Sequence, residues 1–158
     1  MKKAGYIAGT LGIFFLLFAL YAPQIFSHCQ IPCGIYDDHM RVHMIAEHVT
    51  TIEKSMKQIE LLSKDPASNA NQLVRWVTNK EQHAAELDDI VTKYFMTQRL
   101  KPTEEGDGQA YEDYIEQLTL LHQMLFYSMK CKQTTDLENP EKLREVLDKF
   151  EKAYFAEK

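Results

Sequence analysis

Apolar side chains recur three and four positions apart over most of the chain after residue 37, which is the spacing of one face of an α-helix. The first helix is expected to begin at Asp37 or Asp38, either of which can cap it. It should end near Asp65-Pro66, because proline disfavours helix in the residue before it. Its apolar stripe consists of Ile45, Val49, Ile52, Met56 and Ile59.

Three further stretches show the same spacing. The second helix should begin near Ser68 or Asn69 and end before Lys101-Pro102, with the stripe Leu73, Val77, Ala84, Leu87, Val91 and Tyr94. After a polar loop over residues 103–108, the third carries Tyr111, Tyr114, Leu118, Leu121, Leu125 and Met129. Asn139-Pro140-Glu141 predicts the start of the fourth, with Asn139 as its cap and the stripe Leu143, Leu147, Phe150 and Tyr154.

Four amphipathic helices joined by short loops predict an all-α fold, an antiparallel up-and-down four-helix bundle. No β-hairpin signal competes with this prediction. The methionine and aromatic residues on the stripes are expected to form the core. The tyrosine and phenylalanine content of the last two helices exceeds what one small bundle needs, which indicates a subunit interface.

Residues 1–27 differ in kind from the rest of the chain. Lys2 and Lys3 precede an apolar stretch centred on residues 11–20, and Pro23 and the small residue Ser27 follow. This is the layout of a secretory signal peptide that is cut after Ser27. The alternative is an uncleaved anchor, because residues 4–26 could just span a bilayer. A cut at this point predicts an exported protein, periplasmic or extracellular. The protein would touch a membrane only if the leader stays uncleaved.

Composition agrees with one modest domain over residues 28–158. The full chain has 158 residues, of which 45% are hydrophobic, and this is enough for a single core. Its formal net charge is −5, which argues against a nucleic-acid partner. A small anion would need a local basic patch to approach, because the overall field of an acidic protein repels it.

Residues 28–36, directly after the leader, depart from the helical pattern and are expected to form an irregular N-terminal metal hook. Pro32 and Gly34 keep this segment out of regular structure. If His28 becomes the N-terminus, it offers an α-amine and an imidazole. Cys29 offers a backbone amide and a thiolate, and Cys33 adds a second thiolate. A planar nitrogen and sulfur set of this kind favours nickel or copper over tetrahedral zinc.

The chain has three cysteines, and a disulfide is the alternative for the first two. In that case the protein would be a non-enzymatic exported or membrane-anchored helical protein, with a Cys29–Cys33 disulfide or a metal-delivery site. The free amine of His28 discriminates between the two readings, because an uncleaved leader removes it as a ligand. Cys131 lies in an apolar helical pattern and is expected to be a small buried hydrophobe.

The segment His28-Cys29-Gln30-Ile31-Pro32-Cys33-Gly34-Ile35-Tyr36 closely resembles the hook motif of the nickel superoxide dismutases, His-Cys-x-x-Pro-Cys-Gly-x-Tyr. The resemblance extends to residues 51–56, 79–83 and 93–95 and so covers most of residues 28–158. It implies a homohexamer of four-helix bundles with one nickel per subunit. It also implies an antioxidant enzyme that converts two superoxide ions to dioxygen and hydrogen peroxide by Ni(II)/Ni(III) cycling.

The same resemblance assigns roles to individual residues. His28, Cys29 and Cys33 would bind the metal, and Tyr36 would cover the open face of the site. A glutamate on the first helix and an arginine on the second orient the histidine in this family. Glu47 is the best match to the glutamate, whereas His83 stands at the arginine position, with Arg75 as a possible substitute. Since histidine titrates near neutrality, this departure affects how the site should respond to pH.

The remaining histidines give weaker signals. His39, His43 and Glu47 lie four residues apart and could form a separate metal site on one helix face. His48 and His122 have no convincing partners in the sequence. No Glu-x-x-His motif is present, which argues against a di-iron site of the ferritin type.

Overall fold

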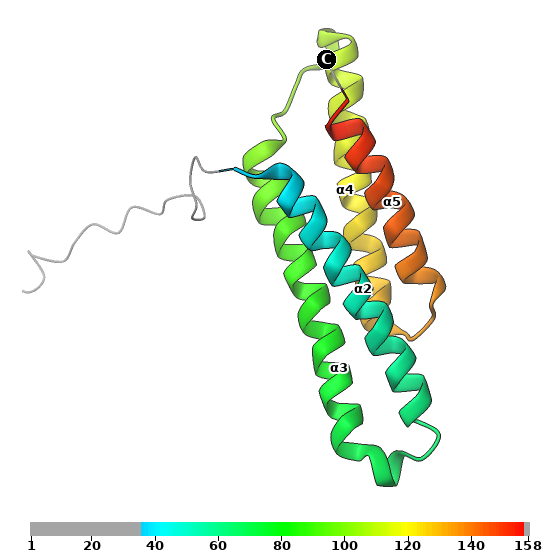
Figure 1. The fold of residues 1–158 in the computed structure, drawn as a ribbon. Coiled ribbons are helices and arrows are strands. Elements are labelled where there is room, and N and C mark those ends of the chain that lie inside the picture. The colour runs from blue at the N-terminus through cyan, green and yellow to red at the C-terminus, as the bar shows by residue number, and fades with distance from the viewer. Residues whose placement is uncertain (1–35, 157–158) are drawn as a thin grey trace, which may run out of the picture. The chain divides into compact units, whose positions relative to one another are not determined.

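A computed structural model describes residues 36–156, which all belong to one compact unit, Pro32–Lys158. Four long helices make up most of this part: α2 (Asp38–Leu62), α3 (Pro66–Asp89), α4 (Gln109–Gln133) and α5 (Glu138–Tyr154). A π-helical segment, η1 (Ile90–Arg99), continues α3, and a short 3₁₀ turn, η2 (Glu105–Asp107), precedes α4 (Figure 1). The described residues contain no strand, so the prediction of an all-α protein is confirmed.

Aspartate caps set the first two helix starts. The Asp37 carboxylate accepts a hydrogen bond of 2.9 Å from the backbone N–H of Met40, as expected for an N-cap. Asp65 does the same for Ser68 at 3.3 Å, so α3 begins at Pro66 rather than at Ser68 or Asn69. Proline is tolerated there because the first N–H groups of a helix have no intrahelical partner.

The last helix does not begin as predicted. Asn139 is not its cap, because α5 already starts at Glu138, whose N–H donates to the Asp136 carboxylate at 3.0 Å. The Asn139 amide instead donates to the hydroxyl of Thr134 and the carbonyl of Asp136 in the preceding turn. Pro140 therefore lies within the first turn of α5, where it costs no hydrogen bond.

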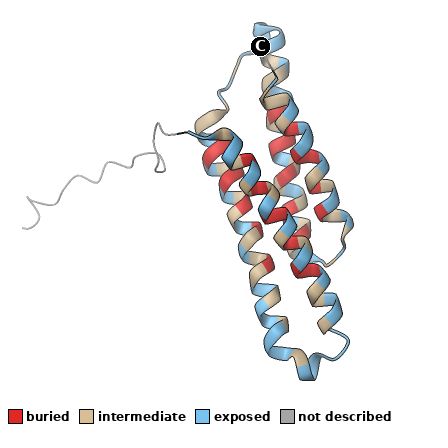
Figure 2. Cartoon of the chain, in the orientation of Figure 1, coloured by how far each residue is buried: buried red, intermediate tan, exposed pale blue. Residues whose placement is uncertain are grey.

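The core lies along the inner faces of the helices, but none of residues 57–79, at the end of α2 and the start of α3, is buried (Figure 2). The stripe of α2 is confirmed for Ile45, Val49, Ile52 and Met56, which are fully buried. That of α5 is confirmed for Leu143, Leu147 and Phe150. The stripe of the predicted second helix is confirmed for Ala84 and Leu87 in α3 and for Val91 and Tyr94 in η1.

The predicted stripe of α4 is wrong. Of its six residues, Leu121 alone is buried, and Met129 is 41% exposed. The helix instead buries Leu120, Leu121, Met124 and Cys131, together with the polar residues Gln117 and Ser128. Those two polar side chains donate to the carbonyls of Ala153 and Ala84, so each one is satisfied in the core.

Val77 is also outside the core, with an exposure of 42%. The reason lies at Lys80, a buried lysine of α3 that donates to the carbonyls of Cys131 at 2.8 Å and Lys132 at 2.6 Å. These are the last carbonyls of α4, which have no intrahelical partner of their own. The part of α3 before Lys80 therefore extends past the end of α4, so α4 does not cover Val77.

Cys131 is completely buried, as predicted. Burial raises the pKa of its thiol to about 11, so the thiol stays protonated and poorly reactive at neutral pH. Of the helices that the structure describes, none is long and apolar enough to cross a membrane.

Candidate functional site

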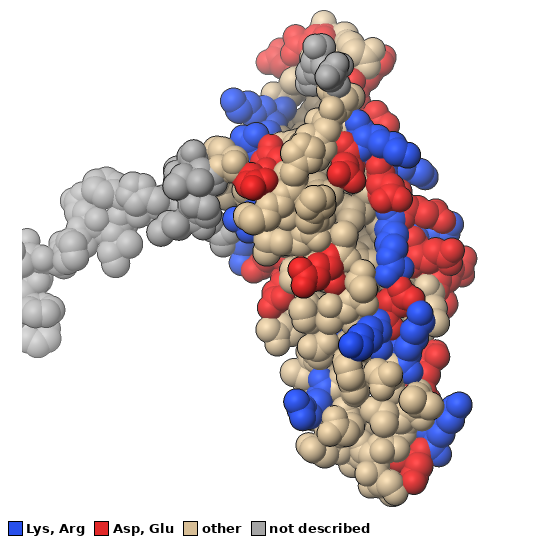
Figure 3. Space-filling view, viewed as in Figure 1, with Lys and Arg blue, Asp and Glu red and all other residues tan. Residues whose placement is uncertain are grey.

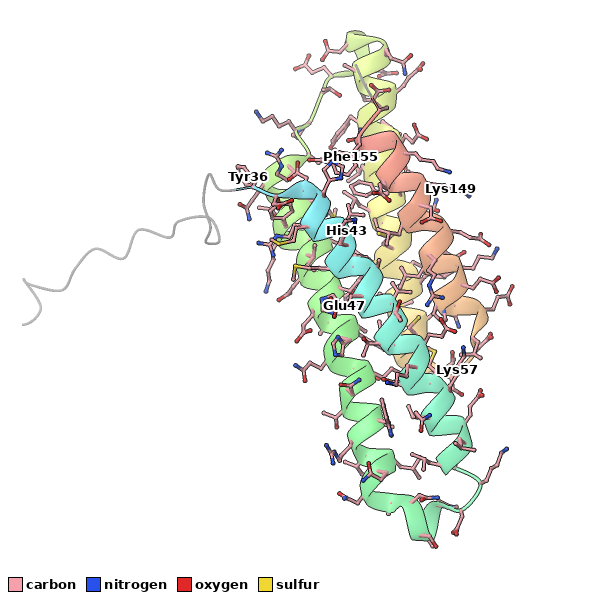
Figure 4. All side chains as sticks on the ribbon, in the orientation of Figure 1. Tyr36, His43, Glu47, Lys57, Lys149 and Phe155 are labelled. Carbon is pink, nitrogen blue, oxygen red and sulfur yellow. The ribbon has the colours of Figure 1, made fainter. Side chains whose placement is uncertain are left out.

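The described part of the hook is Tyr36, at the start of α2. His28, Cys29 and Cys33 lie outside the described residues, so their predicted roles remain predictions. The Tyr36 ring is 40% exposed and is held from one side by η1 (Figure 4). The guanidinium carbon of Arg99 lies 4.3 Å from its ring centroid, and the Tyr94 ring meets it edge to face at 5.9 Å. The point at which the hook joins the helices is therefore fixed by aromatic and cation–π contacts.

Beneath Tyr36, the carboxylate of Asp38 joins three elements. Arg99 donates from Nε to Oδ1 at 2.9 Å and from Nη2 to Oδ2 at 2.7 Å, in a bidentate arrangement. The Tyr94 hydroxyl donates to Oδ1 at 2.5 Å, and the Tyr154 hydroxyl donates to Oδ2 at 2.9 Å. We call Asp38, Tyr94, Arg99 and Tyr154 the Asp38 cluster. It ties α2, η1 and α5 together next to Tyr36.

The cluster shifts the titration of its members. Burial raises the pKa of Asp38, but hydrogen bonds from Arg99, Tyr94 and Tyr154 outweigh it, so the pKa lies below its ordinary value. Burial and the hydrogen bond to Asp38 raise the pKa of Tyr94 to about 12, and that of Tyr154 likewise to about 12. At neutral pH the cluster therefore holds one carboxylate, one guanidinium and two neutral phenols.

The Asp38 cluster was not predicted from the sequence, in which Asp38 stands out only as a possible helix cap. Its partners lie 56, 61 and 116 residues further along the chain. Local spacing carries no signal for such contacts. The π-helical turns of η1 help to bring Arg99 into the cluster, and no pattern in residues 90–99 predicted them.

The two residues predicted to orient His28 lie on different helices. Glu47 is an exposed residue of α2, one turn after His43 (Figure 4). His83 is a half-buried residue of α3, and its Nδ1 lies 2.9 Å from Nδ1 of His48. His48 therefore has a partner, contrary to the expectation from the sequence. Arg75 lines a shallow pocket with Gln72, Trp76 and Asn79, two turns before His83.

Glu86 completes this group. Its Oε2 lies 3.6 Å from Nδ1 of His48 and 3.7 Å from Nδ1 of His83. Burial, followed by the charge of His83, lowers the pKa of His48, which outweighs the raising effect of Glu86 and Glu47. The neutral imidazole of His48 is therefore favoured at neutral pH.

The alternative metal site at His39, His43 and Glu47 is not brought together. Within residues 36–156, the one group of three side chains with metal-ligand atoms close to each other is His48, His83 and Glu86. The ring of His39 instead stacks on Phe155 at 3.8 Å, and His43 is exposed.

Acidic and basic side chains alternate along the α5 side of the visible face (Figure 3).

The buried position of Cys131 limits which thiolates a metal could use. Because this thiol is enclosed in the core and protonated, thiolate ligands must come from Cys29 and Cys33. Two thiolates with amine and amide nitrogens fit nickel, whereas His48, His83 and Glu86 offer no sulfur donor. The thiolate and amide donors that a nickel redox couple needs are thus available at the hook and not at the histidine pair.

Comparison with known proteins gives the family. The family model of nickel-containing superoxide dismutase matches residues 23–158, which include the hook and every described helix. No curated protein and no solved structure gave a match. The all-helical fold agrees with this match, and so do the donors of the hook, since Cys131 is excluded as a thiolate ligand. The match shows that the chain belongs to the nickel-containing superoxide dismutases, oxidoreductases whose metal is nickel.

Proposed function

We propose that the mature chain begins at His28 and dismutes superoxide at a nickel ion held by His28, Cys29 and Cys33. The family match carries this proposal, because it spans the one segment of the chain with two cysteines and a histidine at hook spacing. Bound nickel would supply a one-electron Ni(II)/Ni(III) couple. Two superoxide ions and two protons then give one dioxygen and one hydrogen peroxide.

The hook residues have separate tasks in this proposal. His28 supplies its α-amine and imidazole, which requires that the leader is removed after Ser27. Cys29 supplies its amide nitrogen and thiolate, and Cys33 supplies a second thiolate. These anionic donors push electron density toward the metal, which brings the trivalent state within reach of superoxide. An uncleaved leader converts the amine to an amide and removes that donor.

Tyr36 would limit access to the site. Its contacts with Arg99 and Tyr94 hold the ring at the end of the hook, and its exposure leaves the ring free to face the metal site. A bulky aromatic at this position admits a diatomic anion and excludes larger ligands.

We also propose the antiparallel up-and-down arrangement of the four helices, with the hook at one end. Contacts between α2 and α3 support it, because His48 meets His83, Ser55 meets Asn79 and Leu62 meets Asn69. Positions that advance along α2 thus pair with positions that recede along α3. Contacts between α2 and α5 follow the same rule: Asp38 pairs with Tyr154 and Glu53 pairs with Arg144.

Assembly into a homohexamer and export from the cytoplasm also belong to the proposal. Exposed apolar side chains on α4, among them Ile115 at 39%, Phe126 at 44% and Met129 at 41%, support burial against another subunit. The leader pattern supports export. Light scattering on the mature protein should give the mass of six chains, and a monomer mass would contradict the assembly.

His83 and Glu47 would orient the His28 imidazole. We expect His83→Ala to change both the Ni(III) electron paramagnetic resonance spectrum and the pH profile of dismutation, because it removes the ionisable ring that would hold the His28 imidazole in this proposal. His122→Ala, at an exposed histidine of α4, serves as the matched control. If His83→Ala leaves both the spectrum and the profile unchanged, His83 does not act on His28.

A dismutase assay on nickel-loaded protein tests the function itself. Protein with a free His28 amine should be active, whereas the same protein extended by one residue before His28 should be inactive. Nickel-loaded protein with a free His28 that lacks activity would support the alternative of a disulfide or a metal-delivery site.

A further inference from the structure

We propose that His48, His83 and Glu86 form a second metal site, separate from the hook, that binds a divalent ion of the zinc type. The three side chains come from two helices: His48 from α2, and His83 and Glu86 from one turn of α3. The site is built from described residues alone, so it does not depend on the structure of the hook or on the proposed function.

The distances between the donor atoms suit one ion. The two Nδ1 atoms are 2.9 Å apart, and Oε2 of Glu86 lies 3.6 Å and 3.7 Å from them. For a triangle of these sides, a point about 2.0 Å from all three atoms exists, which is the length of Zn–N and Zn–O bonds. That point lies in the plane of the three atoms, and bonds of about 2.1 Å place the ion slightly outside the plane, where a fourth ligand can complete the set.

The carboxylate is already oriented toward the two imidazoles. Gln82 donates from Nε2 to Oε1 of Glu86 at 2.8 Å, which leaves Oε2 as the oxygen that faces both rings. A hydrogen bond of this kind holds a ligand in place and is typical of metal sites. His48 is only 9% exposed, so its ring is fixed by the packing of α2 against α3.

The surroundings leave room for a fourth ligand. The side chain of Glu86 is 43% exposed and that of His83 is 26% exposed, so one side of the triangle faces water. Two imidazoles, one carboxylate and a water form the tetrahedral set of open zinc sites. Without sulfur donors and with only one carboxylate, the set favours zinc, cobalt or copper over calcium or magnesium.

The proposed role of His83 toward His28 is compatible with this site. The metal site uses Nδ1 of His83, and Nε2 on the opposite side of the ring remains for a contact with the hook. A plain hydrogen bond between the two imidazoles is the competing interpretation of the 2.9 Å distance. In that case the pair would bind no ion.

Cobalt and zinc binding to the mature protein with Cys29→Ser and Cys33→Ser would separate these interpretations. The two substitutions remove the hook thiolates, so binding that remains is assigned by further variants. We expect one Co(II) per chain with the visible absorption of tetrahedral cobalt, displaced by Zn(II). In the same background, His48→Ala and Glu86→Gln should weaken binding by about 100-fold or more, since each removes a ligand.

His122→Ala in this background is the matched control and should bind cobalt like the parent. Thermal unfolding gives a second readout, because an ion that binds the folded state alone raises the midpoint. Zn(II) should raise the midpoint of the parent and of His122→Ala, but not that of Glu86→Gln, whose half-exposed position makes a folding defect small. Binding that His48→Ala and Glu86→Gln leave unchanged, or no saturable binding in the parent, would overturn the proposal.

Discussion

Replacement of Cys29 or Cys33 with serine is expected to reduce dismutation to the uncatalysed rate while the helices stay folded. A serine hydroxyl is not deprotonated at neutral pH and donates far less charge than a thiolate. The metal would lose the ligand that brings its trivalent state within reach. We expect the helices to stay folded, because the buried core of the described residues is formed by side chains between Val42 and Phe150. Activity after nickel loading and circular dichroism measure the two effects separately.

Cys131→Ala is the matched control for these substitutions. Cys131 is completely buried between α4 and its neighbours, so its truncation should lower the free energy of unfolding by about 1 kcal/mol. Activity per folded molecule should remain, because this thiol is not a metal ligand. Full activity of Cys29→Ser or Cys33→Ser after nickel loading would contradict the hook as the metal site.

Asp38→Asn should destabilise the protein by about 2–3 kcal/mol at neutral pH. The substitution keeps the shape of the side chain but removes the carboxylate. This group pairs with Arg99 and accepts hydrogen bonds from the hydroxyls of Tyr94 and Tyr154. Hydrogen bonds to a charged group are worth more than neutral ones, and a partly buried guanidinium left without its partner adds to the cost. We expect activity to fall as well, since Arg99 and Tyr94 also hold Tyr36.

The difference in the free energy of unfolding between wild type and Asp38→Asn should depend on pH, in a direction that the pKa of Asp38 defines. The pKa of Asp38 in the folded protein is below its unfolded value of about 3.9. The carboxylate therefore contributes its full stability above the unfolded pKa, and this contribution is lost as the pH falls through the folded pKa. The stability gap between wild type and Asp38→Asn should narrow correspondingly in acid.

Urea denaturation over this pH range measures the gap. Glu145→Gln serves as the control, because its pair with Lys142 is exposed and should contribute less than about 1 kcal/mol. A free energy of unfolding for Asp38→Asn within about 0.5 kcal/mol of wild type would show that the Asp38 cluster does not stabilise the fold.

The helices were predictable where one face alone is apolar. On α2, polar residues separate the apolar residues of the stripe between Ile45 and Met56, so spacing identified the buried face. On α4, apolar residues occupy most of the circumference, and the buried face was decided by Gln117 and Ser128, which find carbonyl partners on other helices. Spacing could not reveal this choice because the partners are distant in sequence.

The candidate sites divide in the same way. The hook could be proposed from the sequence because its donors and the residues that would shape it lie within nine consecutive positions. The Asp38 cluster and the His48–His83 pair were not, because each depends on the register between helices. His48 and His83 are 35 residues apart, and a shift of one helix by a single position would separate them.

In the proposed site, the hook binds the metal only when His28 carries a free amine. Intact mass and metal content, measured together on protein purified from its native host, test this most directly. We predict a mature chain that begins at His28 and carries one nickel ion bound at the hook. A nickel-containing, active protein that keeps its leader, or a mature chain that begins at another residue, would contradict the proposed site.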